Sequence, residues 1–144
     1  MGKMAVIAHG GAGPGPERQE NLQKAVDVAT ELLLAGASAI EAAVEACVVL
    51  EDDPVFNAGT GGGFRNDGSV LLDASIQTSD GRIGFVIAMP DTPNPIRVAA
   101  DLLDENINGL TGLGARKWAD NRGHANRPVE GREPIEGDGD TVGV

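Results

Sequence analysis

Apolar residues recur in the first third of the chain at the spacing of two amphipathic helices. Gly36 predicts the end of the first helix, and Ser38 with Glu41 has the spacing of a capping box that opens the second. We expect these helices to lie side by side, after a short buried strand at residues 4–8. The first apolar stripe consists of Leu22, Ala25, Val26, Ala29, Leu32 and Leu33, and the second of Ile40, Ala43, Val44, Cys47 and Leu50.

Two apolar runs in the middle of the chain predict β-strands at residues 70–76 and 83–89. Residues 79–81, Ser-Asp-Gly, lie between them and have the composition of a hairpin turn. A shorter strand at residues 64–66 is expected to turn at residues 67–68, Asp-Gly, before the first of these strands. The middle of the chain therefore predicts an antiparallel hairpin.

Asn94 and Pro95 occupy N-cap and N1 positions for a third helix, and a weaker pattern predicts a fourth at residues 113–121. A strand, two helices, a hairpin and further helices predict a layered α/β (α+β) fold, with helices on at least one face of the sheet. The expected inner face of the third helix consists of Ile96, Ala99, Ala100 and Leu103.

The chain becomes polar and rich in Pro, Gly and Glu over residues 123–138, which predicts a flexible, exposed linker. Residues 139–144 turn β-like again, so the chain has the appearance of a domain that continues beyond residue 144. Its 144 residues, of which 41% are hydrophobic, suit one domain or a large piece of one.

The formal net charge of -11 repels phosphate backbones and anionic lipids, so neither nucleic acid nor a membrane surface is an expected partner. No segment has the length and apolar character of a transmembrane helix, and residues 1–8 do not resemble a signal peptide. Cys47 is the only cysteine, lies in an apolar stripe and is expected to be a buried structural thiol. These features favour a cytoplasmic protein.

Three short islands carry the candidate chemistry: residues 8–13 (AHGGAG), residues 50–59 (LEDDPVFNAG) with residues 72–75 (LDAS), and residues 139–143 (GDTVG). In this order they resemble plant-type L-asparaginases and isoaspartyl peptidases, which are self-cleaving threonine N-terminal-nucleophile hydrolases. The resemblance implies an αββα sandwich that is incomplete in this chain. Residues 1–144 would supply its α-subunit portion, and residues 139–144 the cleavage junction and the start of a β-subunit strand.

The resemblance makes Thr141 the catalytic nucleophile and places the cleavage site between Asp140 and Thr141. The threonine hydroxyl would attack the carbonyl of Asp140, whose carboxylate is placed to assist proton removal. Cleavage would free an α-amino group with a pKa of roughly 7.7–8.0, which serves as the base in turnover. Most plant-type members have Gly before this threonine, so Asp140 leaves the substrate preference open. Without the resemblance, Thr141 would be interpreted as an ordinary strand residue.

The resemblance also assigns a supporting role beside the active site to His9, Gly10, Gly11 and Asn57. The glycine spacing does not fit a dinucleotide-binding loop, and Pro14 removes an amide donor that such a loop needs. For His9, a tight glycine turn with the ring bonded to neighbouring backbone is an equally good interpretation.

A structural sodium ion is the only ion that the resemblance implies, and no cofactor is expected in catalysis. Main-chain carbonyls in a compact loop supply the oxygen ligands that hard cations prefer. A loop that only links helix to strand remains the alternative. The carbonyls assigned to the ion are those of Leu50, Glu51, Asp53, Phe56, Ala58 and Thr60.

The implied reaction is hydrolysis of L-asparagine or of β-aspartyl (isoaspartyl) dipeptides through an acyl-threonine intermediate. The substrate-binding residues would lie in a C-terminal β-subunit segment, with two αβ units forming a dimer, so this chain alone is expected to be inactive. The alternative function is a non-catalytic, cation-stabilised scaffold that assembles with a partner chain. Glu136, Asp138 and Asp140 imitate the start of a calcium loop, but Thr141 stands where that loop needs glycine, which favours a solvated acidic turn.

Overall fold

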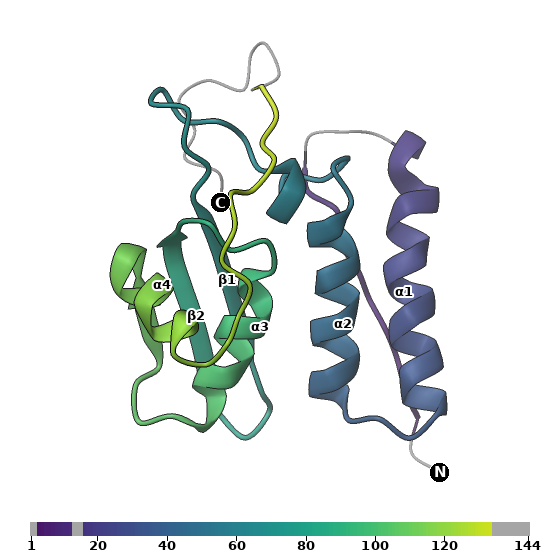
Figure 1. The fold of residues 1–144 in the computed structure, drawn as a ribbon. Coiled ribbons are helices and arrows are strands. Elements are labelled where there is room, and N and C mark those ends of the chain that lie inside the picture. Colours follow the sequence, from purple (N-terminus) through teal and green to yellow (C-terminus); the bar gives the residue numbers. More distant parts are fainter. Residues whose placement is uncertain (1–2, 13–15, 134–144) are drawn as a thin grey trace.

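The computed structural model describes residues 3–12 and 16–133 and has two halves (Figure 1). One half is a pair of antiparallel helices, and the other is a three-stranded sheet with two helices packed on it. The fold is therefore mixed α/β, as the sequence predicts. The helices are α1 (Gln19–Leu34), α2 (Ala39–Asp52), α3 (Pro95–Asp101) and α4 (Gly112–Asp120), and the strands are β1 (Leu72–Gln77), β2 (Ile83–Met89) and β3 (Gly109–Thr111).

The helix pair confirms the predicted end and start signals. Gly36 has a φ of 92°, and the N–H of Ala37 bonds to the carbonyl of Leu32 at 2.9 Å, which closes α1 with a Schellman motif. At the start of α2, Ser38 accepts from the N–H of Glu41, whose carboxylate accepts in turn from the N–H of Ser38.

The apolar stripe of α2 is shifted from the predicted one. Ala42 and Val44 are buried, whereas Ala43 is exposed, so the prediction for Ala43 is wrong. The stripe faces α1 on one side and α3 on another, and this divided packing does not follow a single helical face. Cys47 is half-buried; desolvation, followed by the charge of Glu51, raises the pKa of its thiol. Both features suit a structural thiol.

The predicted hairpin is confirmed, with β2 at the expected residues and β1 beginning two residues later than expected. The two strands are antiparallel, and a bulge interrupts their register between Leu72 and Ala74. β3 pairs with β2 in parallel through Phe85, Val86 and Ile87, which completes a sheet of order β1-β2-β3. This third strand is too short to have a recognisable sequence pattern.

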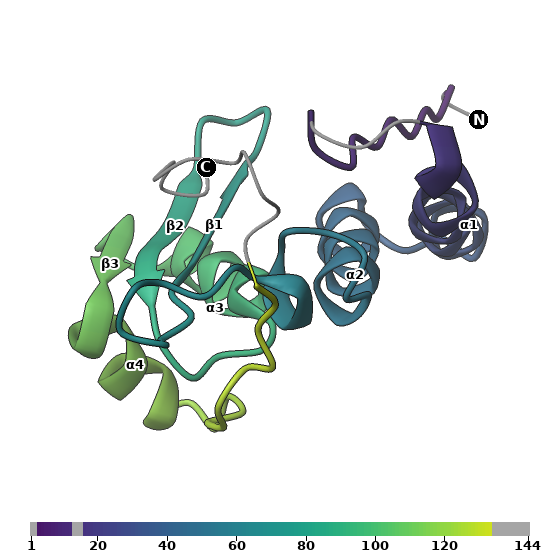
Figure 2. The ribbon, with the colours of Figure 1, turned by 90° about the horizontal axis from the view of Figure 1, so that it is seen from above.

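Two of the predicted strands are wrong. Residues 4–8 form no strand: they run extended over α1 and α2, away from the sheet, and Ile7 is 95% exposed (Figure 2). A strand needs a neighbour for its backbone N–H and C=O groups, and no described residue pairs with this segment. At residues 64–66 the expected turn forms, with Gly68 at a φ of 79°, but only Gly63 makes an isolated bridge.

Both sheet-covering helices pack on one face (Figure 2), and the position of Gly84 shows how closely they approach it. A Cβ on Gly84 would lie 2.0 Å from the carbonyl oxygen of Ala99 in α3. On the opposite face, no described helix covers Ser75, Phe85 and Ile87, and Ile87 is 50% exposed. The core cluster consists of Val86, Met89, Val98, Leu102, Ala115 and Ala119.

α3 begins where Asn94 and Pro95 predict, and α4 runs one residue ahead of the predicted fourth helix. Val98, which lies outside the predicted inner face of α3, is fully buried, whereas Ala100 is only partly buried. Within residues 3–12 and 16–133, no helix is both long and apolar enough to cross a bilayer.

Candidate active-site loop

The loop after α2 folds back tightly on itself because two of its glycines leave no room for a side chain. Gly59 has a φ of 48°, and a Cβ there would lie 2.2 Å from the carbonyl oxygen of Glu51. A Cβ on Gly61 would lie 1.9 Å from the carbonyl oxygen of Phe56 and 2.7 Å from that of Pro54. Main-chain carbonyls from both ends of the loop therefore crowd the turn at Gly59–Gly61.

The predicted donor set for a monovalent cation includes two of these carbonyls, those of Glu51 and Phe56, and the ion site stays a prediction. The carbonyl oxygens of Asp53 and Ala58 each accept one backbone hydrogen bond, at 3.2 Å from Phe56 and 2.9 Å from Gly61, and each retains a second lone pair. Among the described residues, no group of three or more His, Cys, Asp or Glu side chains is arranged to hold a metal ion. A cation at this loop would therefore depend on the backbone.

The side chain of Asp53 fixes the start of the loop. Its two carboxylate oxygens accept from Asn21 Nδ2 at 2.7 Å and from the N–H of Val55 at 3.1 Å. Partial burial acts to raise the pKa of Asp53, but these hydrogen bonds and the positive charges of Lys24 and Arg18 hold it below its ordinary value. The loop is thus tied to the first turn of α1.

Phe56 brings the N-terminal glycine island to the loop. Its side chain is 3% exposed, and a Cβ on Gly10 would lie 2.7 Å from its ring atom Cε1. Only glycine permits this approach. Gly11, at a φ of 96°, donates its N–H to Nδ1 of the exposed His9 at 3.2 Å, as in a local glycine turn. Two of the three islands therefore lie together in the structure.

Asn57 has an exposed side chain whose Oδ1 accepts from the N–H of Gly63 at 3.2 Å. This bond links the middle of the loop to the chain that leaves it. Asp140 and Thr141 lie outside the described residues, so the catalytic and cleavage assignments remain predictions.

Glu51 has a role that the sequence analysis missed, since it was considered only for its carbonyl. Its carboxylate is buried, and Oε1 accepts from the N–H of Ile96 at 3.0 Å, which caps α3 in place of Asn94. Oε2 has no hydrogen-bond partner among the described residues. Burial raises the pKa of Glu51 to about 7, against the opposing effects of the Ile96 hydrogen bond, Asn94 and Arg97.

Two more polar contacts lie beside Glu51 between α2 and α3. Asn94 Nδ2 donates to Asp52 at 2.9 Å, and the guanidinium of Arg97 makes two bonds to Glu45, at 2.6 and 2.9 Å. The cap that Glu51, at the end of α2, makes on the start of α3 depends on the tertiary fold, and no local sequence pattern predicts it.

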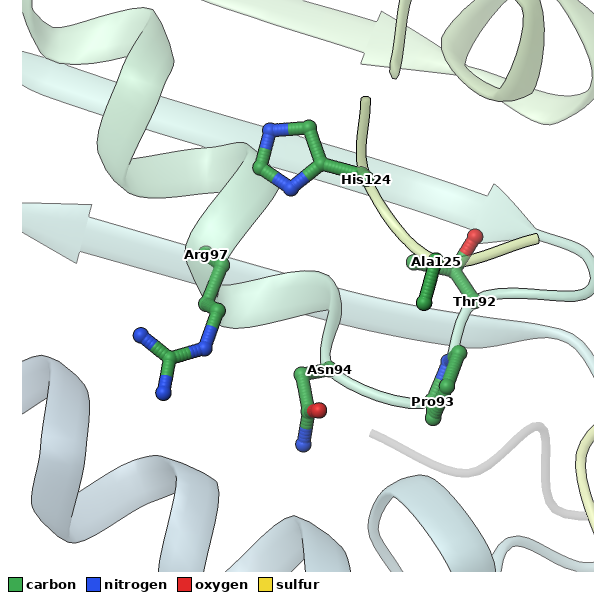
Figure 3. Close-up of a pocket in the computed structure, with 6 residues that line it drawn as sticks. All are labelled: Thr92, Pro93, Asn94, Arg97, His124 and Ala125. Atoms are coloured by element: carbon green, nitrogen blue, oxygen red, sulfur yellow. The ribbon is translucent and has the colours of Figure 1, made fainter. Parts of the chain in front are cut away.

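A small cavity lies between the start of α3 and the linker residues His124 and Ala125 (Figure 3). Its volume of about 40 Å³ accommodates water molecules and is far below the several hundred Å³ typical of a pocket for an organic substrate. Its two basic groups already have partners, since Arg97 pairs with Glu45 and His124 Nε2 lies 2.8 Å from Asp101. We assign it no role in catalysis. The cavity is lined by Thr92, Pro93, Asn94, Arg97, His124 and Ala125.

The described part of the polar linker, residues 123–133, is mainly exposed but is held at several places. The buried guanidinium of Arg116 donates to the carbonyls of His124 and Ala125, at 3.4 and 2.9 Å. Farther along, Arg132 Nε donates to the carbonyl of Gly61 at 2.8 Å. The linker sequence gave no indication of these contacts.

Comparison with known proteins identifies a family for most of the chain. The family model described as asparaginase matches residues 2–131. Over 124 residues the chain is 39% identical to a plant-type L-asparaginase of Pyrococcus abyssi, with 81% of this chain and 40% of that protein covered.

Two mammalian relatives give a similar result. An isoaspartyl peptidase/L-asparaginase of Rattus norvegicus is 36% identical over 135 residues, which is 88% of this chain and 40% of that protein. The Homo sapiens protein of the same name is 37% identical over 126 residues, covering 83% of this chain and 41% of that protein. The chain thus spans about 40% of the length of these relatives. It belongs to the asparaginase family whose model it matches from residue 2 to residue 131.

Proposed function

We propose that this chain is the α-subunit portion of an amidohydrolase that acts on L-asparagine, β-aspartyl dipeptides or both. The observation that carries the proposal is the packing of Gly10 against Phe56, which unites two of the three family-like islands in one place. The printed names of the relatives, plant-type L-asparaginase and isoaspartyl peptidase/L-asparaginase, indicate the substrate class.

Maturation begins with the hydroxyl of Thr141. Its oxygen attacks the carbonyl carbon of Asp140, the peptide C–N bond breaks, and the acyl group moves from nitrogen to oxygen as an ester. Water then hydrolyses this ester, which leaves a carboxylate on Asp140 and a free α-amino group on Thr141. Gly139 and Gly143 on either side have no Cβ, which permits the backbone to adopt the geometry for attack.

Turnover uses the same hydroxyl together with the new amino group. The neutral amine accepts the hydroxyl proton, the oxygen attacks the side-chain amide of the substrate, and ammonia or an amino acid leaves with a proton. Water then releases aspartate from the acyl-threonine. An oxyanion hole and groups that hold the substrate's charged termini are also required, and we assign these to a β-subunit segment after Thr141.

The uncovered face of the sheet is a suitable surface for that segment. Phe85 and Ile87 lie on the face of β2 opposite the core cluster, where Phe85 is half-buried and Ile87 is 50% exposed. A second sheet packed there would complete an αββα sandwich and bury these side chains. Pairing of two such αβ units into a dimer completes the proposed assembly.

A sodium ion bound by the loop would stabilise the site without taking part in the reaction. Two of the proposed ligands, the carbonyls of Glu51 and Phe56, lie against the glycine turn at Gly59–Gly61, and those of Asp53 and Ala58 each keep a lone pair beside one backbone hydrogen bond. Leu50 and Thr60 would complete the set through their own carbonyls. The ion would fix the loop that holds Phe56 and Asn57 and, through them, Gly10 and Gly63.

The decisive test uses the full-length protein and the isosteric variant Thr141→Val, which exchanges the hydroxyl for a methyl group. Wild type should yield two fragments divided between Asp140 and Thr141 by mass spectrometry, and should release ammonia from asparagine or amino acids from β-aspartyl dipeptides. The variant should stay intact and inactive. Thr111→Val is the matched control, because Thr111 is exposed and makes no side-chain cap for α4. An intact, inactive wild type would favour the scaffold function instead.

A further inference from the structure

The chain contains a single Asn-Gly pair, Asn108-Gly109, and it lies at the start of β3. Asn108 is exposed, and its side-chain amide makes no hydrogen bond with another described residue. Gly109 has no Cβ to obstruct the approach of this amide to the Gly109 backbone nitrogen. The side-chain carbonyl carbon of an Asn and the backbone nitrogen that follows it are the two groups that react in spontaneous deamidation.

Packing against Phe85 explains why a glycine occupies position 109. A Cβ there would lie 2.2 Å from two atoms of the Phe85 ring, Cε2 and Cζ. Gly109 is also the residue that pairs with Phe85 in the parallel ladder between β2 and β3. Position 109 is therefore closed to any side chain, while Asn108 beside it remains accessible.

A backbone hydrogen bond at the end of this ladder holds the peptide group between Asn108 and Gly109. The N–H of Phe85 donates to the carbonyl of Asn108 at 2.9 Å, next to the first of the three residue pairs. β3 is three residues long and lies at one edge of the described sheet (Figure 2). Because strand ends at a sheet edge open locally, releasing this peptide group does not require the domain to unfold.

The two Asp-Gly pairs among the described residues have the opposite arrangement. Oδ1 of Asp67 accepts from the N–H and the hydroxyl of Ser69, at 2.9 and 2.6 Å, and the carboxylate of Asp80 accepts from the hydroxyl of Thr78. These bonds lower the pKa of both carboxyl groups, and an ionised carboxylate resists attack by a backbone nitrogen. The amide of Asn108 has no such protection.

We propose that Asn108 is a site of spontaneous deamidation in the folded protein, with Asp and isoaspartate as its products. The Gly109 nitrogen gives its proton to hydroxide and attacks Cγ of Asn108, which closes a succinimide ring. The side-chain nitrogen takes a proton from water and leaves as ammonia. Water then opens the ring at either of its carbonyls, so the residue becomes Asp or isoaspartate.

Conversion of Asn108 weakens the attachment of β3 to the sheet. Isoaspartate adds a carbon to the backbone just before the strand, so the Asn108 carbonyl and Gly109 can no longer both keep their positions opposite Phe85. Either product also adds a negative charge to a segment that already contains the exposed Asp104 and Glu105.

The expected rate follows from how often this end of β3 opens. Release of one backbone hydrogen bond lowers the reactive population by about tenfold at most, so Asn108 should convert at about one tenth of its rate in a peptide of residues 104–113, or faster. Asn106 provides an internal control, because it is also exposed and its amide makes no hydrogen bond with a described residue. It precedes Ile107, whose branched side chain hinders closure of the ring.

The test incubates the full-length protein and the peptide of residues 104–113 at mildly alkaline pH. Peptide mapping by mass spectrometry, with electron-transfer fragmentation to distinguish isoaspartate from Asp, measures conversion at each Asn. Asn108 should convert at about one tenth of the peptide rate or faster, and Asn106 should keep its amide. Asn108→Gln keeps an amide that would have to close a larger ring, and it should abolish conversion at this position. Slower conversion of Asn108 in the protein, or equal conversion at Asn106, would overturn the proposal.

Thermal unfolding of the same samples tests the effect on β3. Incubated wild type should have a lower melting temperature than the fresh protein, in proportion to its isoaspartate content, whereas incubated Asn108→Gln should keep its original value. An unchanged melting temperature in converted wild type would refute the weakening of β3.

Discussion

Replacing Glu51 with glutamine should stabilise the protein by an amount that grows with pH. The substitution retains the size of the side chain and the oxygen that accepts from Ile96, but removes the group that ionises. Burial raises the pKa of Glu51 to about 7, whereas the unfolded chain titrates near the ordinary value of 4.5. The negative charge of Asp52 also raises this pKa and the positive charge of Arg97 lowers it, and the value of about 7 includes both effects.

The sign follows from which state binds the proton. Below pH 4.5 the carboxyl is protonated in both states and the folded state has no penalty. As the pH rises from there to about 7, the unfolded state ionises first, and folding loses stability until the folded carboxyl also ionises. At about 1.4 kcal/mol per pKa unit, the full loss above pH 7 is about 3–4 kcal/mol, and Glu51→Gln avoids it.

Urea unfolding of full-length Thr141→Val with and without Glu51→Gln, between pH 4.5 and 8.5, measures this difference. Glu45→Gln is the matched control from the same helix, because Glu45 is 37% exposed and its ion pair with Arg97 contributes at most about 1 kcal/mol. The stability difference produced by Glu51→Gln should widen across this range. A difference that does not change with pH would refute the argument that burial of the carboxyl controls it.

Three further outcomes are expected at the loop. Gly61→Ala should destabilise the protein by about 3 kcal/mol or more in thermal unfolding, because its Cβ would overlap the carbonyl of Phe56, whereas Gly114→Ala should change little. Replacing sodium with a large organic cation at constant ionic strength should lower the melting temperature, and an unchanged value would contradict the ion site. Asp53→Ala should lower the free energy of unfolding by about 1–2 kcal/mol near neutral pH, because the bonds to Asn21 and Val55 are lost. These bonds favour the ionised carboxylate, which is why the pKa of Asp53 is lowered. The cost of the substitution should therefore fade in acid, where the carboxylate of the wild type is protonated.

The helices were predictable because their signals are local. The capping box at Ser38 and the glycine stop at Gly36 act within one turn of the chain, as does Pro95 at the start of α3. Residues 4–8 failed for the opposite reason: an apolar run predicts a strand, but the strand exists only where another strand receives its hydrogen bonds. β3 is too short for any pattern to predict.

The site was predictable only where a motif marks it. The glycine island and the loop were identified through the family resemblance, and the structure brings Gly10 and Phe56 into contact. The buried carboxylate of Glu51 and the docking of Arg132 were missed, because both residues lie in polar sequence and join partners that are far apart along the chain. Contacts of this kind depend on the tertiary fold, which the residue types alone do not encode in any short pattern.

The position of the loop explains why so many polar contacts surround it. The continuous apolar core lies within the sheet half, whereas α2 meets α3 through Glu51 and Ile96, Asp52 and Asn94, and Glu45 and Arg97. Hydrogen bonds are directional, so this interface fixes the angle between the halves in a way that apolar packing of small side chains does not. The loop leaves α2 at this interface and carries Phe56 and Asn57. The cap that Glu51 makes on α3 therefore also positions the loop relative to the two halves of the molecule.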